Sequence, residues 1–449
     1  MIKRQMSRRD FLRASAMATG ALALAACAPA GAPAGGGSEA ASSEPGVIQW
    51  WFGWGNLEPA VKTIMEREDF QEHIGGQTLE IKAGGVAEPL LAALAAGEPP
   101  DGGSNIDYPG MWTRGVVIPV NDLIEGSDLI NSDDVVEAVW QGAYYGGDMI
   151  GVPSIESYLW YGLNYNAAHV EEAGLDPDNP PLTWEGCLEW HKELTQFDDG
   201  GNLLKIGLDP IDAMAGEPDF AAASFGHQWW DEDTNSFALD HELMAAAIDM
   251  QAEFYRIAGP DNFAGFRQVE GQGGWGGAFN AEVQSMIIEG YWHAGETTIQ
   301  KPEVAEHNRA TWAPVPTDRE GTKIMATGPH MVQIFGEGKN QEGMFQVSEY
   351  LHNHAAMDII FEEVGWIMGV NSWLAKLDAN AYPGLAFYVD ARDQVDEWLI
   401  GRRCPIHWFV NTQLWELREQ VYRDLMTPQE AADELQRRAE AEWDAQGLS

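Results

Sequence analysis

The chain has 449 residues, of which 45% are hydrophobic and 21% are charged. A chain of this length and composition can bury a large core, which excludes wholesale disorder and indicates two large lobes or about three ordinary domains. The net charge is −44, from 70 Asp and Glu against 26 Lys and Arg. So acidic a protein is a poor partner for nucleic acid, and three cysteines exclude a disulfide-dense scaffold.

The N-terminal segment has the layout of an export signal. Met1–Arg13 holds five basic residues and one acid, and the apolar run Ala14–Ala26 follows it. This run of 13 residues is too short to span a hydrocarbon core of about 30 Å comfortably. Ser7–Leu12 resembles the twin-arginine signal, which exports folded proteins. Leu24–Cys27 resembles the bacterial lipobox, in which Cys27 would become the lipid-modified first residue of the mature chain.

Residues 1–26 are therefore expected to be the signal, and residues 27–46, rich in Gly, Ala, Ser and Pro, a flexible tether. An amphipathic N-terminal helix with an ordinary cleavage site is the alternative. No later stretch is both long and apolar enough to be a transmembrane helix. We predict a globular body anchored by lipid on Cys27 to the outer face of the cell membrane, or held in the periplasm.

The first elements of the body alternate between strand and helix. Val47–Phe52 and Thr78–Ala83 have the β-rich or alternating patterns of strands, and Leu57–Phe70 has helical spacing. Glu88–Gly97 carries Pro in its first turn and Gly at its end, which predicts a helix. Its apolar residues occupy every face, so we expect it to be well buried. This order predicts α/β layers with a mostly parallel sheet.

Two later helices are marked by their N-terminal caps. Thr183 opens one helix, with Leu188 and Leu194 on a common stripe. Thr427–Glu430 forms a capping box with Pro at the first helical position, and a second helix is expected to follow. Its apolar residues recur every four positions, at Ala431, Leu435, Ala439 and Trp443. No internal repeat or second linker is visible, so crossings between lobes are expected to be short hinges.

Several segments together resemble family 1 extracellular solute-binding proteins, the maltose-binding-protein-like receptors of ABC importers. The matching motifs occur in the family's order from about Val47 to Trp443: Leu90–Asp101, Gly115–Leu123, Gly151–Pro153 with Leu163–Asn166, Pro181–Glu185, Met286–Trp292, Trp312–Pro316 and Thr427–Trp443. Two segments depart from the pattern. Gly102 and Gly103 stand where the family has apolar strand residues, and Gly328–Met331 stands where a Gly-rich strand start is common.

The resemblance implies an α/β, two-lobed periplasmic-binding-protein fold, type II-like, with the ligand in a cleft between lobes that close by hinge motion. By analogy, lobe one would hold residues 47–152 and 317–360. Lobe two would hold residues 153–316 and 361–449. The family also implies two membrane permease subunits and an ATPase as partners, and a monomeric receptor.

The residue types available to such a cleft favour a neutral sugar. Sugar C–H faces pack on aromatic rings, and sugar hydroxyls bond to carboxylates, amides and indole N–H groups. The chain is rich in Trp and carboxylates and poor in Lys and Arg, which disfavours a phosphorylated or uronate ligand. The candidate ligand-binding residues, each with core packing or a solvated loop as its alternative, are Trp51, Trp54, Asp107, Tyr108, Glu156, Tyr158, Trp230, Trp275, Trp292, Trp366 and Trp408. Trp292 is the strongest, because it matches the Trp of a family motif.

Three further patterns in the sequence bear on metal, redox and catalytic chemistry. His352 and His354 have a spacing that could hold a metal, but no ligand motif surrounds them, so we expect two helix-surface histidines. Cys187 and Cys404 are expected to be buried free thiols, with a disulfide as the alternative. No P-loop, dinucleotide fingerprint or nucleophile elbow is present. No metal, cofactor or catalytic residue is therefore predicted.

The sequence thus predicts a lipid-anchored receptor that binds a sugar or oligosaccharide and delivers it to an ABC permease. The same fold with a polyol, glycerol-phosphate, oligopeptide or polyamine ligand is one alternative. An anchored glycoside hydrolase or polysaccharide lyase is another, because both also use carboxylates and Trp. The sequence names neither the sugar nor its length.

Overall fold

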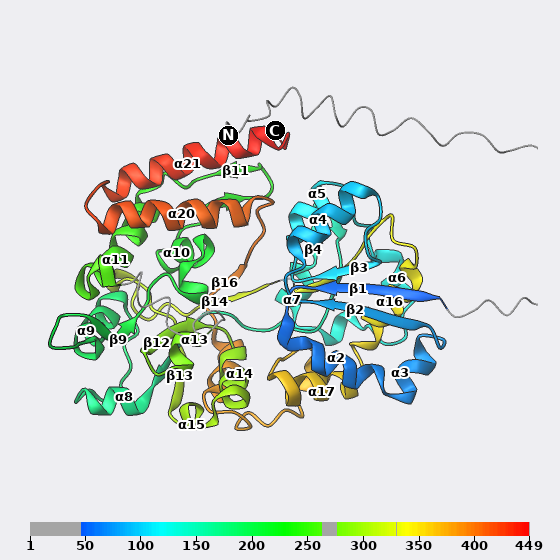
Figure 1. The fold of residues 1–449 in the computed structure, drawn as a ribbon, viewed down its shortest axis with the longest axis horizontal. Coiled ribbons are helices and arrows are strands. Elements are labelled where there is room, and N and C mark those ends of the chain that lie inside the picture. The colour runs from blue at the N-terminus through cyan, green and yellow to red at the C-terminus, as the bar shows by residue number, and fades with distance from the viewer. Residues whose placement is uncertain (1–45, 263–275, 329, 449) are drawn as a thin grey trace, which may run out of the picture. The chain divides into compact units, whose positions relative to one another are not determined.

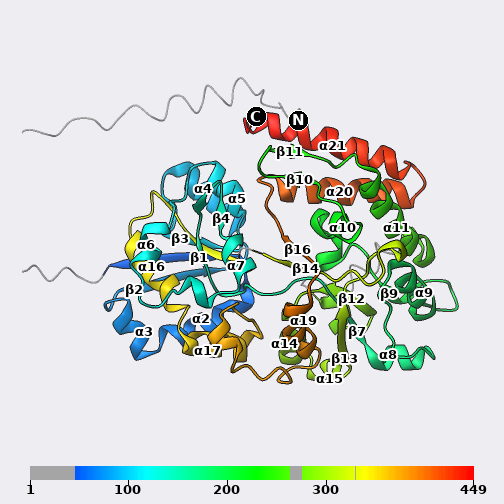
Figure 2. The same cartoon turned by 180° about the vertical axis from the view of Figure 1, so that it is seen from behind.

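The computed structural model describes residues 46–262, 276–328 and 330–448. The predicted signal, nearly all of the tether, Cys27 and Trp275 lie outside the described residues. Figures 1 and 2 show two groups of strands with helices around each, and the closing helices α20 and α21 beside the second group. Among the described residues, no helix combines the length and apolarity needed to cross a bilayer.

Sheet one has the strand order β2-β1-β3-β15-β6. Its strands are β2 (Thr78–Ala83), β1 (Val47–Phe52), β3 (Gly102–Ser104), β15 (Met331–Ile334) and β6 (Val152–Pro153). The predicted strands over β1 and β2 are confirmed residue for residue. The helices of this lobe are α2 (Glu58–Met65), α3 (Glu68–His73), α4 (Ala87–Ala96), α5 (Tyr108–Thr113), α6 (Asn121–Glu125), α7 (Glu137–Gly142), α16 (Gln341–Tyr350) and α17 (His354–Val364). Short elements η1 (Gly55–Leu57), η2 (Ser132–Asp134), β4 (Tyr144–Tyr145) and β5 (Asp148–Met149) complete it.

Two expectations for this lobe were wrong in detail. The helix predicted over Leu57–Phe70 is interrupted, because Arg67 adopts an extended conformation (ψ 136°) and begins α3. The helix predicted at Glu88–Gly97 exists as α4 and ends at Gly97 in the left-handed region (φ 70°), but it is not well buried. Leu90 is its one buried residue and Leu91 is 49% exposed. An all-apolar pattern gives a helix no preferred face, so neighbouring elements decide its burial.

The two glycines of β3 are explained by close packing. A Cβ on Gly102 would lie 2.6 Å from Met344 Cγ, and one on Gly103 would lie 2.9 Å from Ile106 Cδ1. Helix α16 and the loop after β3 therefore approach this strand more closely than apolar strand residues would permit. The departure from the family pattern leaves the strand itself intact, and its register is Trp50 to Gly102 and Trp51 to Gly103.

Sheet two has the order β13-β7-β12-β9-β8. Its strands are β13 (Asn308–Trp312), β7 (Gly162–Asn166), β12 (Gln284–Glu289), β9 (Leu203–Leu208) and β8 (Gln196–Phe197). Only the pair β12–β9 is parallel, and β7 is antiparallel to both of its neighbours. The expectation of a mostly parallel sheet is therefore wrong for this lobe. Two strands of one sheet become parallel when a crossover connection joins them. The chain enters β7 directly from β6 of sheet one, so no crossover within sheet two sets the direction of β7.

The remaining elements cover and link the sheets. The helices outside this first group are α8 (Ala167–Glu172), α9 (Trp184–Leu194), α10 (Pro218–Ser224), α11 (Glu242–Ala258), α13 (Gly277–Asn280), α14 (Trp292–Gln300), α15 (Pro302–Ala305), α18 (Asn371–Leu374), α19 (Leu385–Ala391), α20 (His407–Tyr422) and α21 (Pro428–Ala445). The 3-10 turns are η3 (Ala213–Gly216), η4 (Thr317–Arg319) and η5 (Arg392–Gln394). The hairpin β10 (Trp230–Asp231) with β11 (Ser236–Phe237) packs at α21. The parallel pair β14 (Ile324–Thr327) and β16 (Glu397–Ile400) lies between the two sheets in both views (Figures 1 and 2).

Both predicted capped helices are confirmed. The Thr183 hydroxyl accepts a hydrogen bond from the Gly186 amide at 3.1 Å, at the start of α9. Thr427 and Glu430 form the reciprocal capping box of α21. The four-residue apolar repeat of α21 is buried, at Ala431, Leu435, Ala439 and Trp443. Local sequence signals therefore locate these helix ends.

Cys187 and Cys404 are free and buried, as favoured by the sequence. The expectation of a surface position is wrong for His352. Its side chain is 7% exposed, and its Nε2 bonds to the Pro153 carbonyl at 2.9 Å. Burial lowers the pKa of His352 to about 4. His354 lies at the start of α17, and its Nε2 lies 3.1 Å from the Ser372 hydroxyl. The two side chains therefore have separate partners.

Helices α14 and α17 meet through two glycines, and this contact should be sensitive to one added methyl group. A Cβ on Gly295 would lie 2.4 Å from the Cα of Gly365, a backbone atom that cannot rotate away. Gly295→Ala is therefore expected to lower the free energy of unfolding by about 1–3 kcal/mol. Urea denaturation measures the loss. Gly126→Ala is the control, because its nearest new contact would be 3.6 Å, and equal stability of the two variants would contradict the prediction.

Candidate ligand-binding site

A cavity of about 620 Å³ gathers residues from loops and helices that are far apart in the sequence. It is lined by Gly53, Trp54, Gly55, Asn56, Asn105, Glu156, Trp292, Glu296, Gln300, His330, Trp366, Arg402 and Trp408. Trp54 and Asn105 follow the carboxyl ends of β1 and β3, and Trp292 begins the helix after β12. In α/β sheets, ligands bind outside the carboxyl ends of the strands, so this is the expected position of a binding site.

The aromatic part of the cavity consists of four tryptophans, Trp54, Trp292, Trp366 and Trp408. Trp54 meets Trp366 edge to face, with ring centroids 5.2 Å apart. Trp292 is 8% exposed and Trp366 is 3% exposed, whereas Trp408 is 41% exposed. The indoles thus form fixed walls and one more open surface, which suits a ligand with flat apolar faces.

Glu156 and His330 form a buried polar pair on the cavity wall. Glu156 Oε2 lies 3.0 Å from His330 Nε2, and the two residues are 4% and 6% exposed. Glu156 Oε1 and His330 Nδ1 have no hydrogen-bond partner among the described residues. Buried polar atoms without a partner are costly, and at a cavity wall they are the atoms that a ligand can satisfy.

Glu296 lines the same cavity and lies one turn along α14 from Trp292. Its Oε1 accepts two hydrogen bonds, from Trp366 Nε1 at 2.7 Å and from Asn56 Nδ2 at 3.1 Å. Burial, followed by the nearby charges of Glu289 and Glu156, raises the pKa of Glu296 to about 8. Glu289 is itself buried with His293, at 2.5 Å. The carboxyl of Glu296 is therefore mostly protonated at neutral pH.

Arg402 is held rigidly at the cavity wall. Its Nε and Nη2 donate to the carboxylate of Glu217, at 3.2 and 2.5 Å, and its backbone N–H donates to Asp219 Oδ2 at 2.5 Å. The guanidinium lies 4.9 Å from the ring centroids of both Trp160 and Trp408. The residue has a left-handed backbone (φ 57°), which these contacts maintain. The Glu217 carboxylate thus accepts two hydrogen bonds from the guanidinium, and the indoles of Trp160 and Trp408 pack against it.

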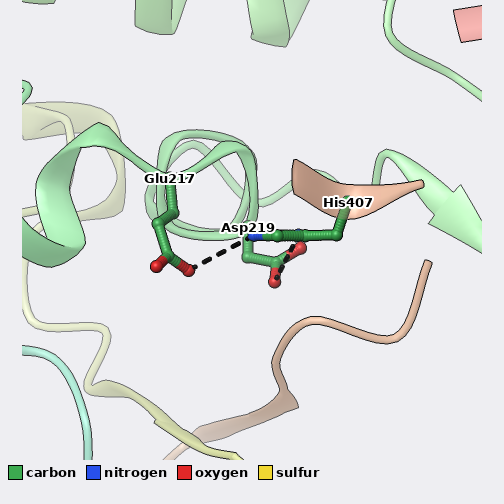
Figure 3. Close-up of side chains that lie close together, drawn as sticks. All are labelled: Glu217, Asp219 and His407. Atoms are coloured by element: carbon green, nitrogen blue, oxygen red, sulfur yellow. Dashed lines mark ion pairs between the residues drawn. The ribbon is translucent and has the colours of Figure 1, made fainter. Parts of the chain in front are cut away.

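The carboxylates that hold Arg402 belong to a buried cluster with His407 (Figure 3). The imidazole lies between them, with Nε2 3.6 Å from Glu217 and Nδ1 3.6 Å from Asp219. Burial acts to raise the pKa of Glu217, but the charge of Arg402 and the nearby imidazole of His407 outweigh it and lower the pKa to about 2. The three side chains are close enough to offer ligand atoms to a metal ion. The guanidinium already bonded to Glu217 opposes a second cation there, so we interpret the cluster as the anchor of Arg402.

Asp107 and Tyr108 lie beside a smaller space that shares Asn105, His330, Arg402 and Trp408 with the main cavity. Asp107 caps α5 by accepting from the Gly110 amide at 3.2 Å, and burial raises its pKa to about 6. The Tyr108 hydroxyl accepts from the amides of Asn105 and Met331, at 2.6 and 3.3 Å. Both residues support the loops that shape the cavity wall.

The structure brings together five of the residues predicted from sequence: Trp54, Glu156, Trp292, Trp366 and Trp408. Three others lie outside this cavity. Trp51 packs under Lys82, whose Nζ is 4.3 Å from its ring, Tyr158 packs on Tyr291 at 5.6 Å, and Trp230 packs on Trp443 at 5.0 Å. Trp275 lies outside the described residues.

Sequence reasoning missed several cavity residues: Asn56, Asn105, Glu296, Gln300, His330 and Arg402. Some signals were available. His330 lies in the segment Gly328–Met331, which departs from the family pattern. Glu296 is four residues after Trp292 and therefore on the same helix face. Arg402 is one of few basic residues in a very acidic chain.

Comparison with known proteins supports an exported protein. Residues 5–25 match the family model of the TAT (twin-arginine translocation) pathway signal sequence. The sequence is 29% identical over 161 residues to the sn-glycerol-3-phosphate-binding periplasmic protein UgpB of Agrobacterium fabrum. That match covers 33% of this chain and 35% of the relative, so it spans about a third of the curated protein.

Solved structures match over most of the chain. CpMnBP1 with mannobiose bound is similar with a TM-score of 0.75 at 18% identity, over 88% of this chain and 99% of that one. An ABC transporter solute-binding protein from Agrobacterium radiobacter K84 in complex with ribitol gives a TM-score of 0.69 at 15% identity, over 88% and 99% of the two chains. The chain thus carries a twin-arginine export signal and has the two-lobed α/β fold of the solute-binding proteins of ABC transporters.

Proposed function

We propose that this protein is an extracytoplasmic receptor that binds a sugar or oligosaccharide and delivers it to an ABC permease with its ATPase. The observation that carries the proposal is the cavity in which four indoles stand beside carboxyl and amide side chains. Aromatic faces and planar hydrogen-bonding groups together are what a pyranose needs. The receptor is proposed to be monomeric and to perform no catalysis.

The proposed binding residues combine those predicted from sequence with those found in the cavity. They are Trp54, Asn56, Asn105, Glu156, Trp292, Glu296, Gln300, His330, Trp366, Arg402 and Trp408. Asp107 and Tyr108 are proposed to support them from the adjoining space. Trp51, Tyr158 and Trp230 are not included, because their contacts lie elsewhere.

The proposal also covers the anchor and the hinge. Cys27 would carry the lipid, and residues 27–46 would be the tether. Lobe one would comprise residues 47–152 and 317–360, and lobe two residues 153–316 and 361–449. Helix α17 packs on α2, so we extend the second part of lobe one to Val364, the end of that helix, and begin the second part of lobe two at Gly365. The lobes would close on the ligand by hinge motion.

The main alternative keeps the fold and changes the ligand. The name of the Agrobacterium fabrum relative points to glycerol phosphate, and the ribitol complex points to polyols. A phosphate is best held by a guanidinium fork that is free to form two bonds. Among the described residues that line the cavity, Arg402 is the one Lys or Arg side chain, and its fork is taken by Glu217. This contact favours an uncharged or positively charged ligand over a phosphate ester.

The experiment is thermal unfolding of the protein without residues 1–46, against mono- and oligosaccharides, polyols, polyamines and glycerol phosphate. A sugar at 100 times its dissociation constant is expected to add about 2.7 kcal/mol of stability and to be recovered intact. Trp408→Ala should weaken binding by about 1–2 kcal/mol, roughly 5- to 30-fold. Trp398→Ala is the matched control, because Trp398 is also 41% exposed and does not line the cavity.

A stability gain with glycerol phosphate and none with any sugar would reject the sugar proposal while leaving the receptor role. Breakdown of the recovered sugar would instead indicate an enzyme. Equal weakening by Trp408→Ala and Trp398→Ala would show that the effect comes from stability rather than from contact with the ligand.

A further inference from the structure

The carboxyl groups around the cavity outnumber the described Lys and Arg side chains that line it. Glu156 and Glu296 line it, and Glu289 lies behind them with His293. The positive charge of Arg402 is matched by Glu217, to which its fork bonds, and by Asp219, which accepts its backbone N–H. Figure 3 shows that both of these carboxylates also flank His407. Among the described residues, the hydrogen bonds of Arg402 thus go to Glu217 and Asp219 and not to Glu156 or Glu296, although its charge is near enough to act on Glu156.

Two of these carboxyl groups have capacity left for a ligand. Glu156 is 4% exposed, and its Oε1 has no partner among the described residues. In Glu296, both described donors, Trp366 and Asn56, bond to the same oxygen, Oε1. The second oxygen of each group can therefore accept a hydrogen bond from a donor in the cavity. The unpartnered atom of Glu156 indicates a ligand donor independently of the excess of carboxyl groups.

We propose that the ligand carries a protonated amine, which Glu156 and Glu296 hold beside the indole faces, and that the substrate class is an amino sugar. This inference rests on the proposed sugar-receptor function. An ammonium group donates hydrogen bonds to carboxylates and is also attracted to the faces of Trp rings. A neutral hydroxyl donates such hydrogen bonds but lacks the attraction of a cation to the rings. The same indoles would pack against the C–H face of the sugar ring.

The electrostatics of the empty cavity agree with this assignment. Burial and the neighbouring charges of Glu289 and Glu156 favour the neutral form of Glu296. A cation placed within about 4–6 Å of a carboxyl group lowers its pKa by about 1–3 units. Binding of an ammonium ligand should therefore ionise Glu296 and release its proton to the buffer. A neutral sugar brings no charge and should release no proton from this group.

The experiment compares matched pairs by isothermal titration calorimetry at pH 7: glucosamine with glucose, galactosamine with galactose, and mannosamine with mannose. In at least one pair, the amine is expected to bind tenfold or more tightly than its neutral partner. Repeating the titration in buffers of different ionisation enthalpy should show release of roughly half a proton or more with the amine. His330 lies against Glu156 and His293 against Glu289, so the variant below assigns the release to Glu296.

Glu296→Gln retains an oxygen that can accept from Trp366 and Asn56 and removes the titrating carboxyl group. It is expected to lower affinity for the amine tenfold or more, to lower affinity for the neutral partner by a smaller factor, and to abolish proton release. Glu193→Gln, an exposed position on α9 away from the cavity, is the control and should change nothing. Wild-type-like preference and proton release in Glu296→Gln would overturn the inference.

The outcomes separate the two proposals. If the neutral member binds as tightly as the amine in every pair, the amino-sugar inference fails and the sugar receptor stands. If spermidine binds and no sugar of either kind does, the sugar receptor and the amino-sugar assignment both fail. The carboxyl groups would then bind a cationic ligand that is not a sugar. If only glycerol phosphate binds, both proposals fail.

Discussion

Arg402→Met is expected to lower the free energy of unfolding at pH 7 by about 3–5 kcal/mol, as measured by urea denaturation. The substitution keeps a long side chain between Trp160 and Trp408 but removes the charge that Glu217 faces. Glu217 is 2% exposed and would remain in the interior as an uncompensated anion. Breaking one side of a buried ion pair is costly for this reason, whereas replacing both sides is often nearly neutral.

A surface pair provides the control for this effect. Arg423 bonds to Glu419 and to Asp261, whose side chain is 95% exposed. Arg423→Met is expected to change stability by no more than about 1 kcal/mol. The double variant Arg402→Met with Glu217→Met should recover part of the loss, because the orphaned carboxylate is gone. A loss below 1 kcal/mol in Arg402→Met would show that the cluster does not depend on this guanidinium.

The same ion pair has a consequence for acid stability. Glu217 has its pKa lowered from 4.5 to about 2 in the folded protein. A carboxyl group with a lowered folded-state pKa contributes stability above its unfolded pKa, and this contribution is lost as the pH falls from about 4.5 toward 2. In Arg402→Met the lowering is largely removed, so the variant should lose less stability than the wild type over this acid range.

The parts of the fold that the sequence predicted are those set by local signals. The strands at Val47–Phe52 and Thr78–Ala83 and the caps at Thr183 and Thr427 depend on residues within a few positions of each other. Strand direction in sheet two and the exposure of Leu91 depend on segments far away in the chain. His352 is a similar case, since its partner is the carbonyl of Pro153 in β6. Periodicity cannot supply such partners.

The candidate site divides in the same way. Trp54 could be placed because it follows a strand whose carboxyl end could be located, and Trp292 because it matches the Trp of a family motif. Arg402 could not, because its role depends on Glu217, which is 185 residues away and not in any motif. Trp51 and Trp54 looked alike in sequence. The alternation of side chains along β1 sends Trp51 toward Lys82 on β2, whereas Trp54 follows the strand and reaches the cavity.

Glu296→Gln is expected to stabilise the unliganded protein increasingly as the pH rises. The pKa of Glu296 is raised from 4.5 to about 8, with burial as the first cause and Glu289 as the second. A carboxyl group whose folded-state pKa is raised binds its proton more tightly when folded, so the wild type loses stability as the pH rises from about 4.5 to 8. Each pKa unit corresponds to about 1.4 kcal/mol, so ionised Glu296 opposes folding by about 4–5 kcal/mol above pH 8. Gln has no proton to lose and escapes this penalty.

The measurement is urea denaturation of the wild type, Glu296→Gln and the exposed control Glu193→Gln at pH 5.5 and pH 8. The stability of Glu296→Gln relative to the wild type is expected to increase by about 3 kcal/mol between these two values, and that of Glu193→Gln should stay constant. A parallel pH dependence in all three proteins would mean that Glu296 titrates normally. A carboxyl group that weakens the empty protein but is satisfied by an ammonium ligand is retained for binding rather than for folding, and this is the trade between stability and function that binding sites commonly show.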